Sequence, residues 1–252
     1  MAIRIRQHVN PLESKFQQPI PIPVWQEVYT ECDRPIHLDI GCARGKFLLD
    51  MAQQDPETNF LGIEIRKPLV EYASQAKDEL GLTNLHYLFG NINSSAKSLL
   101  SSLPKDSLKT ISVQFPDPWF KKKHHKRRVI QPELVKVLVD YLAENGRVFL
   151  QSDIEEVAIQ MRDRFACDER LIGVANPTLL QALETHAGKP FVAVPKERRH
   201  ALACDESTSL IQQHSTWLDT NPLAVPTERE LYVLEQNLPV YRALFVKAGD
   251  RD

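Results

Sequence analysis

Five short β-like runs, each followed by a helix-like segment, are the feature of this sequence that most restricts its fold. In chain order the pairs are Ile36–Ile40 with Lys46–Gln54, Asn59–Ile63 with Pro68–Leu80, Leu85–Phe89 with Ser94–Leu103, Thr110–Phe115 with Pro132–Leu142, and Arg147–Gln151 with Glu155–Phe165. Consecutive β-α units pack as a mostly parallel sheet with right-handed crossovers. The sequence therefore predicts a doubly wound α/β fold, and Val240–Val246 adds a late strand expected to lie antiparallel at the sheet edge.

The remaining segments are assigned around this α/β region. Residues 1–34 are polar and rich in proline, with basic residues at Arg4, Arg6, His8 and Lys15, and we interpret them as a basic N-terminal arm. Residues 35–252 form the main domain, and 252 residues are enough to bury the core of one such domain. Within it the periodic pattern loosens at about 170–225, which we interpret as a variable insertion.

Composition bears on where the chain works. It is 42% hydrophobic and 25% charged without a long apolar run, which is typical of a globular protein with no membrane span. No apolar stretch of signal-peptide length follows the first ten residues, so a cytoplasmic location is expected. The cysteines are scattered and predict neither a disulfide framework nor a metal site; we expect reduced thiols at Cys32, Cys42, Cys167 and Cys204.

The first β-like run ends in a glycine-containing turn, His37–Gly45, that opens the next helix. Gly41 and Gly45 allow the backbone to pass close to a ligand with no side chain between them. A nucleotide-phosphate turn has a similar pattern, but Ala43 replaces the middle glycine and no lysine–hydroxyl pair follows, as it would in a P-loop. Asp39, just before the glycines, is interpreted equally well as a ligand contact or as a solvated or capping residue.

Polar groups also stand at the ends of the next two runs. Glu64 lies about 20 residues after the glycine turn, where an acid can accept hydrogen bonds from ribose hydroxyls. Asn91 follows the third run and offers an amide to an adenine ring. Ligands of open α/β sheets bind at the carboxyl ends of the strands, so these groups predict one nucleoside site. An NAD-dependent dehydrogenase would also have the glycine turn and the acid. The four positions together, with Asp39 placed to contact the amino-acid part of S-adenosylmethionine, favour a methyltransferase.

The fourth run leads into a loop, Phe115–Trp119, that has the sequence Phe-Pro-Asp-Pro-Trp. Its two prolines restrict the backbone around Asp117 and hold the carboxylate with little conformational entropy left to lose. Trp119 offers a ring face on which a base can stack. The loop therefore predicts a preorganised base pocket at the ligand edge of the sheet.

Six lysines and arginines occupy positions 121–128, directly after this loop, in a chain whose formal net charge is −2. A basic run is usually a solvated face or a tail, but this one interrupts a β-α unit at its functional edge. His124 and His125 have no companion metal ligands and are expected to contact phosphate or solvent. We predict contacts with RNA phosphates from Lys122, Lys123, Lys126, Arg127 and Arg128.

Taken together, these motifs resemble the bacterial tRNA (guanine-N7-)-methyltransferase family. The resemblance rests on the glycine turn, Glu64, Asn91, the Pro-Asp-Pro-Trp loop with its basic continuation, Thr227–Glu230 and the arm segment Arg4–Leu12. It covers nearly the whole chain except about residues 170–225. It implies the class I methyltransferase fold with a seven-stranded sheet and one antiparallel edge strand. It also implies S-adenosylmethionine as the donor and a guanine in the variable loop of tRNA as the acceptor.

The resemblance also implies roles for individual residues. Carried over by position, the residues that would bind the donor or act beside it are Asp39, Glu64, Asn91 and Asp117, and those that would hold the substrate are Lys121, Asp153, Thr227 and Glu230. Guanine N7 already presents an in-plane lone pair, so no proton has to be removed before methyl transfer. The enzyme has to align the reacting atoms and stabilise the charge that moves onto the purine, and Asp117 is the predicted catalytic residue.

Two other interpretations compete with a tRNA methyltransferase. A dehydrogenase would leave the loop 115–119 and the adjacent cations without a purpose. A non-enzymatic RNA-binding protein on a degenerate methyltransferase fold would keep the basic run, but it need not keep Glu64, Asn91 and Asp117 together. The predicted partner is tRNA, no membrane or metal partner is expected, and the sequence does not distinguish a monomer from a homodimer.

Overall fold

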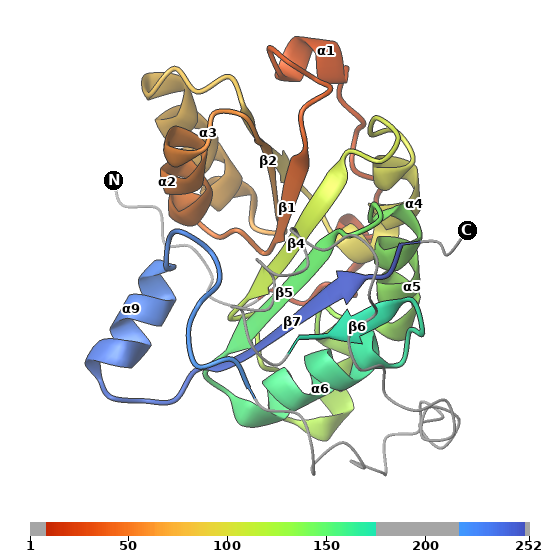
Figure 1. The fold of residues 1–252 in the computed structure, drawn as a ribbon, viewed down its shortest axis with the longest axis vertical. Helices are drawn as coiled ribbons and strands as arrows, with labels where there is room; N and C mark the ends of the chain where they lie inside the picture. The colour runs from red at the N-terminus through yellow and green to blue at the C-terminus, as the bar shows by residue number, and fades with distance from the viewer. Residues whose placement is uncertain (1–8, 175–216, 250–252) are drawn as a thin grey trace.

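A seven-stranded sheet forms the centre of the molecule (Figure 1), with strand order β3-β2-β1-β4-β5-β7-β6. The structure is a computed structural model, and it describes residues 9–174 and 217–249. The strands are β1 (Ile36–Ile40), β2 (Asn59–Glu64), β3 (Leu85–Phe89), β4 (Leu108–Gln114), β5 (Arg147–Ser152), β6 (Leu171–Gly173) and β7 (Tyr241–Lys247). Strands β1 to β5 pair in parallel, whereas β7 runs antiparallel to both of its neighbours, β5 and β6.

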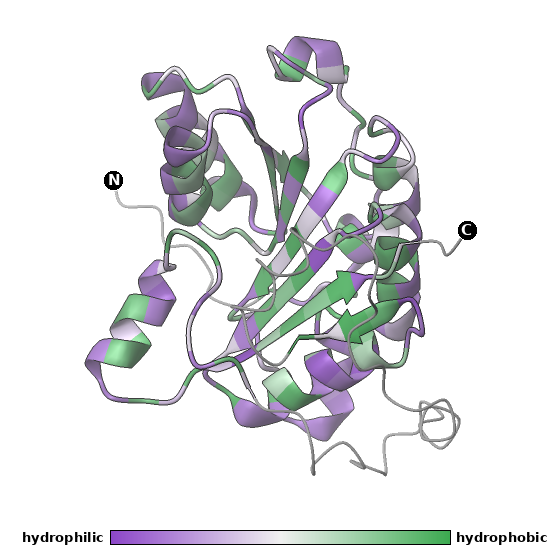
Figure 2. Ribbon diagram, in the orientation of Figure 1, coloured by the Kyte–Doolittle hydropathy of each residue, from purple (hydrophilic) through white to green (hydrophobic). Residues whose placement is uncertain are grey.

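The helices cover both faces of this sheet. They are α1 (Trp25–Val28), α2 (Lys46–Gln54), α3 (Lys67–Glu79), α4 (Ile92–Leu100), α5 (Pro132–Tyr141), α6 (Glu155–Ala166) and α9 (Glu228–Glu235), with 3-10 helices η1 (Ser14–Phe16) and η2 (Lys122–Arg127). Helices α2 and α3 lie on one side of the sheet, and α4 and α5 lie on the other (Figure 1). Every residue of β1 and β2 is buried, as expected for parallel strands covered on both faces. The central strands are accordingly mostly hydrophobic, and hydrophilic residues gather on the helices (Figure 2).

The doubly wound α/β fold predicted from the sequence is confirmed. All five predicted β-α units are present, and their observed ends differ from the predicted ones by no more than three residues. The antiparallel strand predicted in the tail is β7, and β6 adds a further strand beyond it. The sequence did not reveal β6 because three residues are too few to show the alternation that identifies a strand.

The described part of the arm packs on the domain. Ile20 and Trp25 are buried in the core, and the backbone N–H of Ile20 donates to Ser95 Oγ of α4 at 2.8 Å. After the 175–216 gap, Leu218 packs against Phe149 of β5. The first eight residues, residues 175–216 of the expected insertion, and Cys204 lie outside the described residues, so the predicted division into arm, domain and insertion stays a prediction.

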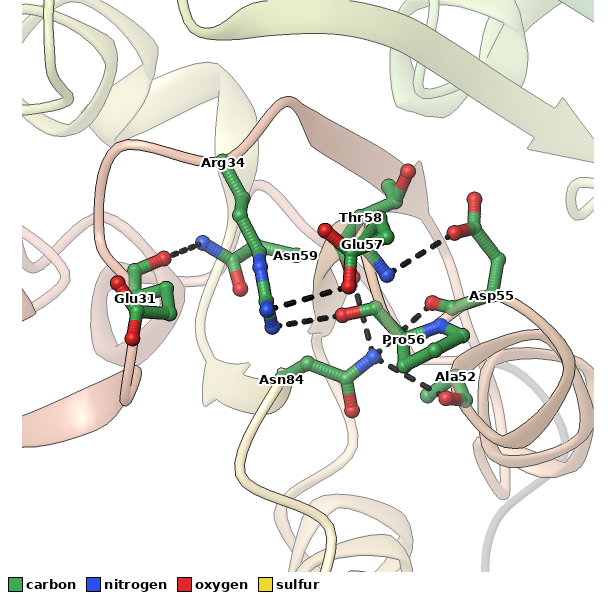
Figure 3. Close-up of polar contacts among 9 residues, drawn as sticks. All are labelled: Glu31, Arg34, Ala52, Asp55, Pro56, Glu57, Thr58, Asn59 and Asn84. Atoms are coloured by element: carbon green, nitrogen blue, oxygen red, sulfur yellow. Dashed lines mark hydrogen bonds and ion pairs between the residues drawn. The ribbon is translucent and has the colours of Figure 1, made fainter.

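Side-chain amides and a guanidinium tie together the loops at the edge where β1 and β2 begin (Figure 3). Asn59 and Arg34 donate to loop carbonyls at 2.7 Å. Asn84 Nδ2 donates at 3.1 Å to each of three carbonyls, those of Ala52, Asp55 and Thr58. Carbonyls that no helix or strand satisfies are thereby paired. These bonds lie at the edge where the parallel strands begin, and the opposite edge, where those strands end, holds the candidate site.

Two findings bear on environment and redox state. Within the described ranges, no helix combines the length and the apolar character needed to cross a membrane. Cys32, Cys42 and Cys167 are free thiols. The cytoplasmic location expected from the sequence stays a prediction.

Candidate active site

A cavity of approximately 230 Å³ opens at the carboxyl ends of β1, β2, β3 and β4. Four of the residues predicted to share a ligand site line it: Gly41, Glu64, Asn91 and Asp117. Lys126, Arg127 and Arg128 from the basic run also reach its wall. The topology therefore brings the ends of separate strands to one place, as expected for an open parallel sheet.

The two glycines of the first turn have different surroundings. Both have positive φ, +86° at Gly41 and +72° at Gly45, which favours glycine. A Cβ at Gly41 would meet no atom within 4 Å, so the backbone there borders open space. A Cβ at Gly45 would lie 2.5 Å from the ring of Tyr87, whose hydroxyl donates to the Gly45 carbonyl at 2.7 Å. Gly45 does not line the cavity and makes room for Tyr87, and its predicted contact with the donor stays a prediction.

Glu64 is 2% exposed, and internal bonds hold its carboxylate. Oε2 accepts from the backbone N–H of Ala43 at 3.0 Å, which joins the end of β2 to the glycine turn. Oε1 accepts from the backbone N–H of Arg66 at 2.9 Å. The Arg66 guanidinium adds two bonds, from Nε to Oε1 at 2.8 Å and from Nη2 to Oε2 at 2.9 Å. Sequence reasoning missed Arg66, although a cation two residues after the predicted ribose acid was the available signal.

Asp39 is 4% exposed and does not line the cavity. Ser112 Oγ donates to its Oδ1 at 2.6 Å, and Gln114 Nε2 donates to the same oxygen at 3.3 Å. Burial raises the pKa of Asp39 to about 6, although these two hydrogen bonds oppose the rise. His37 Nε2 lies 2.8 Å from Ser112 Oγ, and burial lowers the pKa of that imidazole to about 4. Asp39 is therefore neither solvated nor a helix cap, and its predicted contact with the donor stays a prediction.

A chain of hydrogen bonds continues from Asp39 across the sheet. Gln151 Nε2 donates to Gln114 Oε1 at 2.8 Å and to Glu230 Oε2 at 3.1 Å. Glu230 is 1% exposed, and its other oxygen pairs with Arg242 Nη2 at 2.7 Å. Sequence reasoning missed Gln114 and Gln151, although an amide near the end of each of two apolar strands was a visible signal. The chain connects β1, β4, β5, β7 and α9 beneath the site.

Asn91 caps a helix and also lines the cavity. Its Oδ1 accepts from the backbone N–H of Asn93 at 3.1 Å and so caps the N-terminus of α4. Its Nδ2 donates to the carbonyl of Pro11 at 3.3 Å. Pro11, Leu12 and Gln17 of the arm line the same cavity. The arm therefore forms one wall of the site, which the sequence did not indicate.

The loop after β4 is held in a strained backbone. Phe115 and Trp119 have φ values of +49° and +42°, in the left-handed region that bulky side chains rarely adopt. Such residues persist only where surrounding contacts impose them, and they cluster at functional sites. Arg128 Nε donates to the carbonyl of Pro118 at 2.7 Å and is one such contact. Asp117, between the two strained residues, is presented to the cavity from a rigid support.

The basic run forms η2 and separates into two groups. Its exposed members are Lys121, Lys122, Lys123 and Lys126. The Arg127 guanidinium lies 4.9 Å from the centre of the Trp119 ring, the ring that was predicted to stack a base. Arg128 is 4% exposed and pairs with Glu156 at 2.9 Å, and Nη1 donates to Gln160 at 3.1 Å. The Arg128 guanidinium is buried and anchors the loop to α6, and its predicted phosphate contact stays a prediction.

The other predicted substrate residues form a second group at the end of β5. Thr227 Oγ1 accepts from the backbone N–H of Glu230 at 3.1 Å and caps α9. Asp153 follows β5 and forms an ion pair with Arg229. These residues and Lys121 do not line the cavity, and their substrate roles stay predictions. Among residues 9–174 and 217–249, no cluster of His, Cys, Asp or Glu could hold a metal ion.

The strand order, the single antiparallel strand and the cavity at the strand ends define a class I methyltransferase. A family model described as "Putative methyltransferase" matches residues 33–189. Three curated proteins named tRNA (guanine-N(7)-)-methyltransferase are similar to this chain over nearly its full length. The protein of Microcystis aeruginosa is 48% identical over 96% of this chain and 97% of its own length. The proteins of Synechococcus elongatus and Synechocystis sp. are 48% and 47% identical, over 97% and 96% of both chains respectively. The chain belongs to the tRNA (guanine-N(7)-)-methyltransferase family.

Proposed function

We propose that this chain transfers a methyl group from S-adenosylmethionine to N7 of a guanine in the variable loop of tRNA. Membership of the family supports the reaction and the acceptor. The observation that carries the proposal is the position of Asp117. A strained loop presents its carboxylate to the cavity that Gly41 and Glu64 line, directly before the exposed lysines of η2.

The residues of the cavity fit the donor. At Gly41 a side chain would occupy space that is open, which leaves the backbone accessible to a ligand. Glu64 would hold the ribose, Asn91 would contact the adenine, and Asp39 would act on the amino-acid part through the turn that follows it. When bound, the donor supplies an electrophilic methyl group on a sulfonium.

Methylation of guanine N7 requires the guanine to be oriented toward the methyl donor, and it does not require a general base. Because N7 carries an available lone pair, Asp117 is not required to remove a proton from it. Its carboxylate would accept hydrogen bonds from guanine N1–H and N2–H and face the positive charge that develops on the purine. Phe115 or Trp119 would pack on the ring. The remaining substrate contacts are proposed for Lys121, Asp153, Thr227 and Glu230, and the phosphate contacts for Lys122, Lys123, Lys126 and Arg127.

Nucleoside analysis of tRNA after incubation with the protein and S-adenosylmethionine tests the proposal. The expected product is 7-methylguanosine at one position in the variable loop, formed only when donor and protein are both present. The control is the same tRNA transcribed with adenosine at that position, which should remain unmethylated. Methylation at another base, or of both transcripts alike, would overturn the assignment.

A further inference from the structure

The carboxylate of Glu64 has no acceptor capacity left for a ribose. A carboxylate offers about four lone-pair positions on its two oxygens. Glu64 accepts four hydrogen bonds: one from Ala43 N, one from Arg66 N and two from the Arg66 guanidinium. The two bonds from backbone N–H groups hold the glycine turn and the residues that follow β2 in place. The guanidinium bonds come from a side chain, so they can be exchanged by rotation of that side chain without unfolding these segments.

The size of the cavity agrees with a side chain lying in the ligand's place. Pockets for small molecules and cofactors usually measure about 300–1,000 Å³. This cavity measures approximately 230 Å³, and Arg66 forms part of its wall next to Glu64. Moving the guanidinium off the carboxylate would enlarge the cavity at the position where ribose hydroxyls have to arrive.

A second acid also attracts the guanidinium of Arg66. Arg66 and Asp117 line the same cavity, and the negative charge of Asp117 favours the charged guanidinium even in the present arrangement. A guanidinium binds carboxylates through a planar fork, so it can exchange one acid for another by rotating its side chain.

We infer that Arg66 is a residue of the donor site: its guanidinium occupies the ribose position on Glu64, and the two ribose hydroxyls displace it toward Asp117. The inference rests on the proposed function, because it takes an adenosyl donor as the ligand. Arg66 is then a specificity-determining residue, since only a ligand with both hydroxyls replaces the two guanidinium bonds. Binding of the donor also changes the charge beside the predicted catalytic acid.

Binding of S-adenosylhomocysteine to Arg66→Met, measured by calorimetry, tests the displacement. Methionine has a similar length but no donor, so we expect about three- to tenfold tighter binding than in the wild type, because the competitor for Glu64 is gone. The unliganded variant should have a lower Tm, since the buried Glu64 loses its counter-ion. The 2′,3′-dideoxy analogue of S-adenosylhomocysteine should bind the variant no tighter than the wild type.

Two further variants control the measurement. Arg34→Met removes an arginine that pairs with the exposed Glu57 outside the cavity, and it should leave both affinities unchanged. Arg66→Lys keeps a cation that can replace only part of the fork, so an intermediate affinity is expected, and this variant serves if Arg66→Met does not fold. Equal or weaker binding of S-adenosylhomocysteine by Arg66→Met and Arg66→Lys would overturn the inference. Failure of the wild type to bind it at all would instead overturn the proposed donor.

A double-mutant cycle tests the transfer toward Asp117. If Asp117 receives the displaced guanidinium, Asp117→Asn raises the dissociation constant of S-adenosylhomocysteine when Arg66 is present. The factor by which it rises should be at least threefold smaller in the Arg66→Met background. If Asp117 contacts the donor without involving Arg66, the loss is the same in both backgrounds. The second result would contradict the transfer.

Discussion

The proposed donor side and the proposed RNA side of the site differ in how their charged groups are paired. On the donor side, Glu64 and Asn91 are buried and bonded to groups within a few residues of themselves, Arg66 and Asn93. On the RNA side, the lysines of η2 extend into solvent. A ligand on the donor side has to replace existing bonds, whereas a phosphate on the RNA side adds a partner to a solvated cation. We therefore expect ligand selectivity from the donor side and salt-sensitive affinity from the RNA side.

Asp117 lies where the two regions meet, so its substitution is expected to affect turnover and tRNA binding to very different extents. Asp117→Asn keeps the shape of the side chain but removes the charge that faces the purine. We expect kcat to fall by about 10³-fold, the size of effect seen when a preorganised electrostatic contact is lost. The dissociation constant for tRNA should change by no more than a few-fold, because phosphate contacts dominate RNA affinity.

Single-turnover kinetics and filter binding measure these two effects. Asp106→Asn, at an exposed turn before the opposite end of β4, is the matched control and should change neither. If Asp117→Asn retained near-normal turnover, the catalytic assignment would be wrong. A large loss of tRNA binding in the same variant would instead place Asp117 on the RNA side.

Asp39 and His37 are buried beneath the donor side, and their shifted pKa values predict how the free energy of unfolding depends on pH. A carboxyl whose pKa rises from 3.8 to about 6 on folding binds its proton more tightly in the native state. Its contribution to the free energy of unfolding is therefore most favourable below pH 3.8 and declines as the pH rises to about 6, by about 3 kcal/mol. His37, with its pKa lowered to about 4, contributes with the opposite sign: stability rises as the pH increases from about 4 to 6.5.

Asp39→Asn isolates the first contribution, because the amide oxygen can still accept from Ser112 and Gln114 but does not titrate. Relative to the wild type, the variant should gain stability between pH 4 and pH 7, by up to about 3 kcal/mol. Urea unfolding at several pH values measures this difference, and the contribution of His37 cancels in the comparison. A difference that does not change with pH would show that Asp39 is not titrating as a buried acid.

The two glycines of the first turn are expected to respond differently to substitution by alanine. Gly41→Ala and Gly45→Ala both place alanine at positive φ, so both include similar backbone strain. Only Gly45→Ala adds overpacking against Tyr87, which should lower its free energy of unfolding by about 2 kcal/mol more. Gly41→Ala should instead lose more affinity for S-adenosylhomocysteine, since its new methyl group enters the open space of the cavity.

Chemical denaturation and calorimetry on the two variants provide the measurement. Each glycine serves as the control for the other, because φ differs by only 14° between them. Equal losses of stability and of affinity in the two variants would mean that the contacts of Tyr87 and the open space at Gly41 do not distinguish these positions.

On the RNA side, the smallest effect is expected from the exposed lysines. Replacing Lys121, Lys122 and Lys126 by glutamine should weaken tRNA binding by about tenfold at physiological salt, because a few phosphate contacts are lost. The slope of log affinity against log salt should become shallower by about 2, since each contact contributes a little under one. The matched control replaces Lys97, Lys105 and Lys109, which are exposed elsewhere on the domain, by glutamine. An unchanged slope would remove η2 from the RNA interface, and donor affinity should stay constant throughout.

Local pattern in the chain was sufficient to predict the fold and the edge on which the site lies. Helix and strand periodicities depend on residues only a few positions apart, so the β-α units were predicted within a few residues of their observed ends. Parallel strands bring their carboxyl ends to one edge, so the order of strands and helices along the chain was enough to predict that Gly41, Glu64, Asn91 and Asp117 meet. The two prolines likewise indicated a rigid loop around Asp117.

Tertiary structure alone decided which of these groups are exposed and which partners they have. Arg128 and Lys126 look alike in the basic run, yet Arg128 is buried because α6 supplies Glu156 and Gln160. Gly45 faces Tyr87, 42 residues away, and Asp39 bonds to Gln114, 75 residues away. Burial and hydrogen bonding depend on segments that only folding brings together, so no local pattern in the sequence could have specified them.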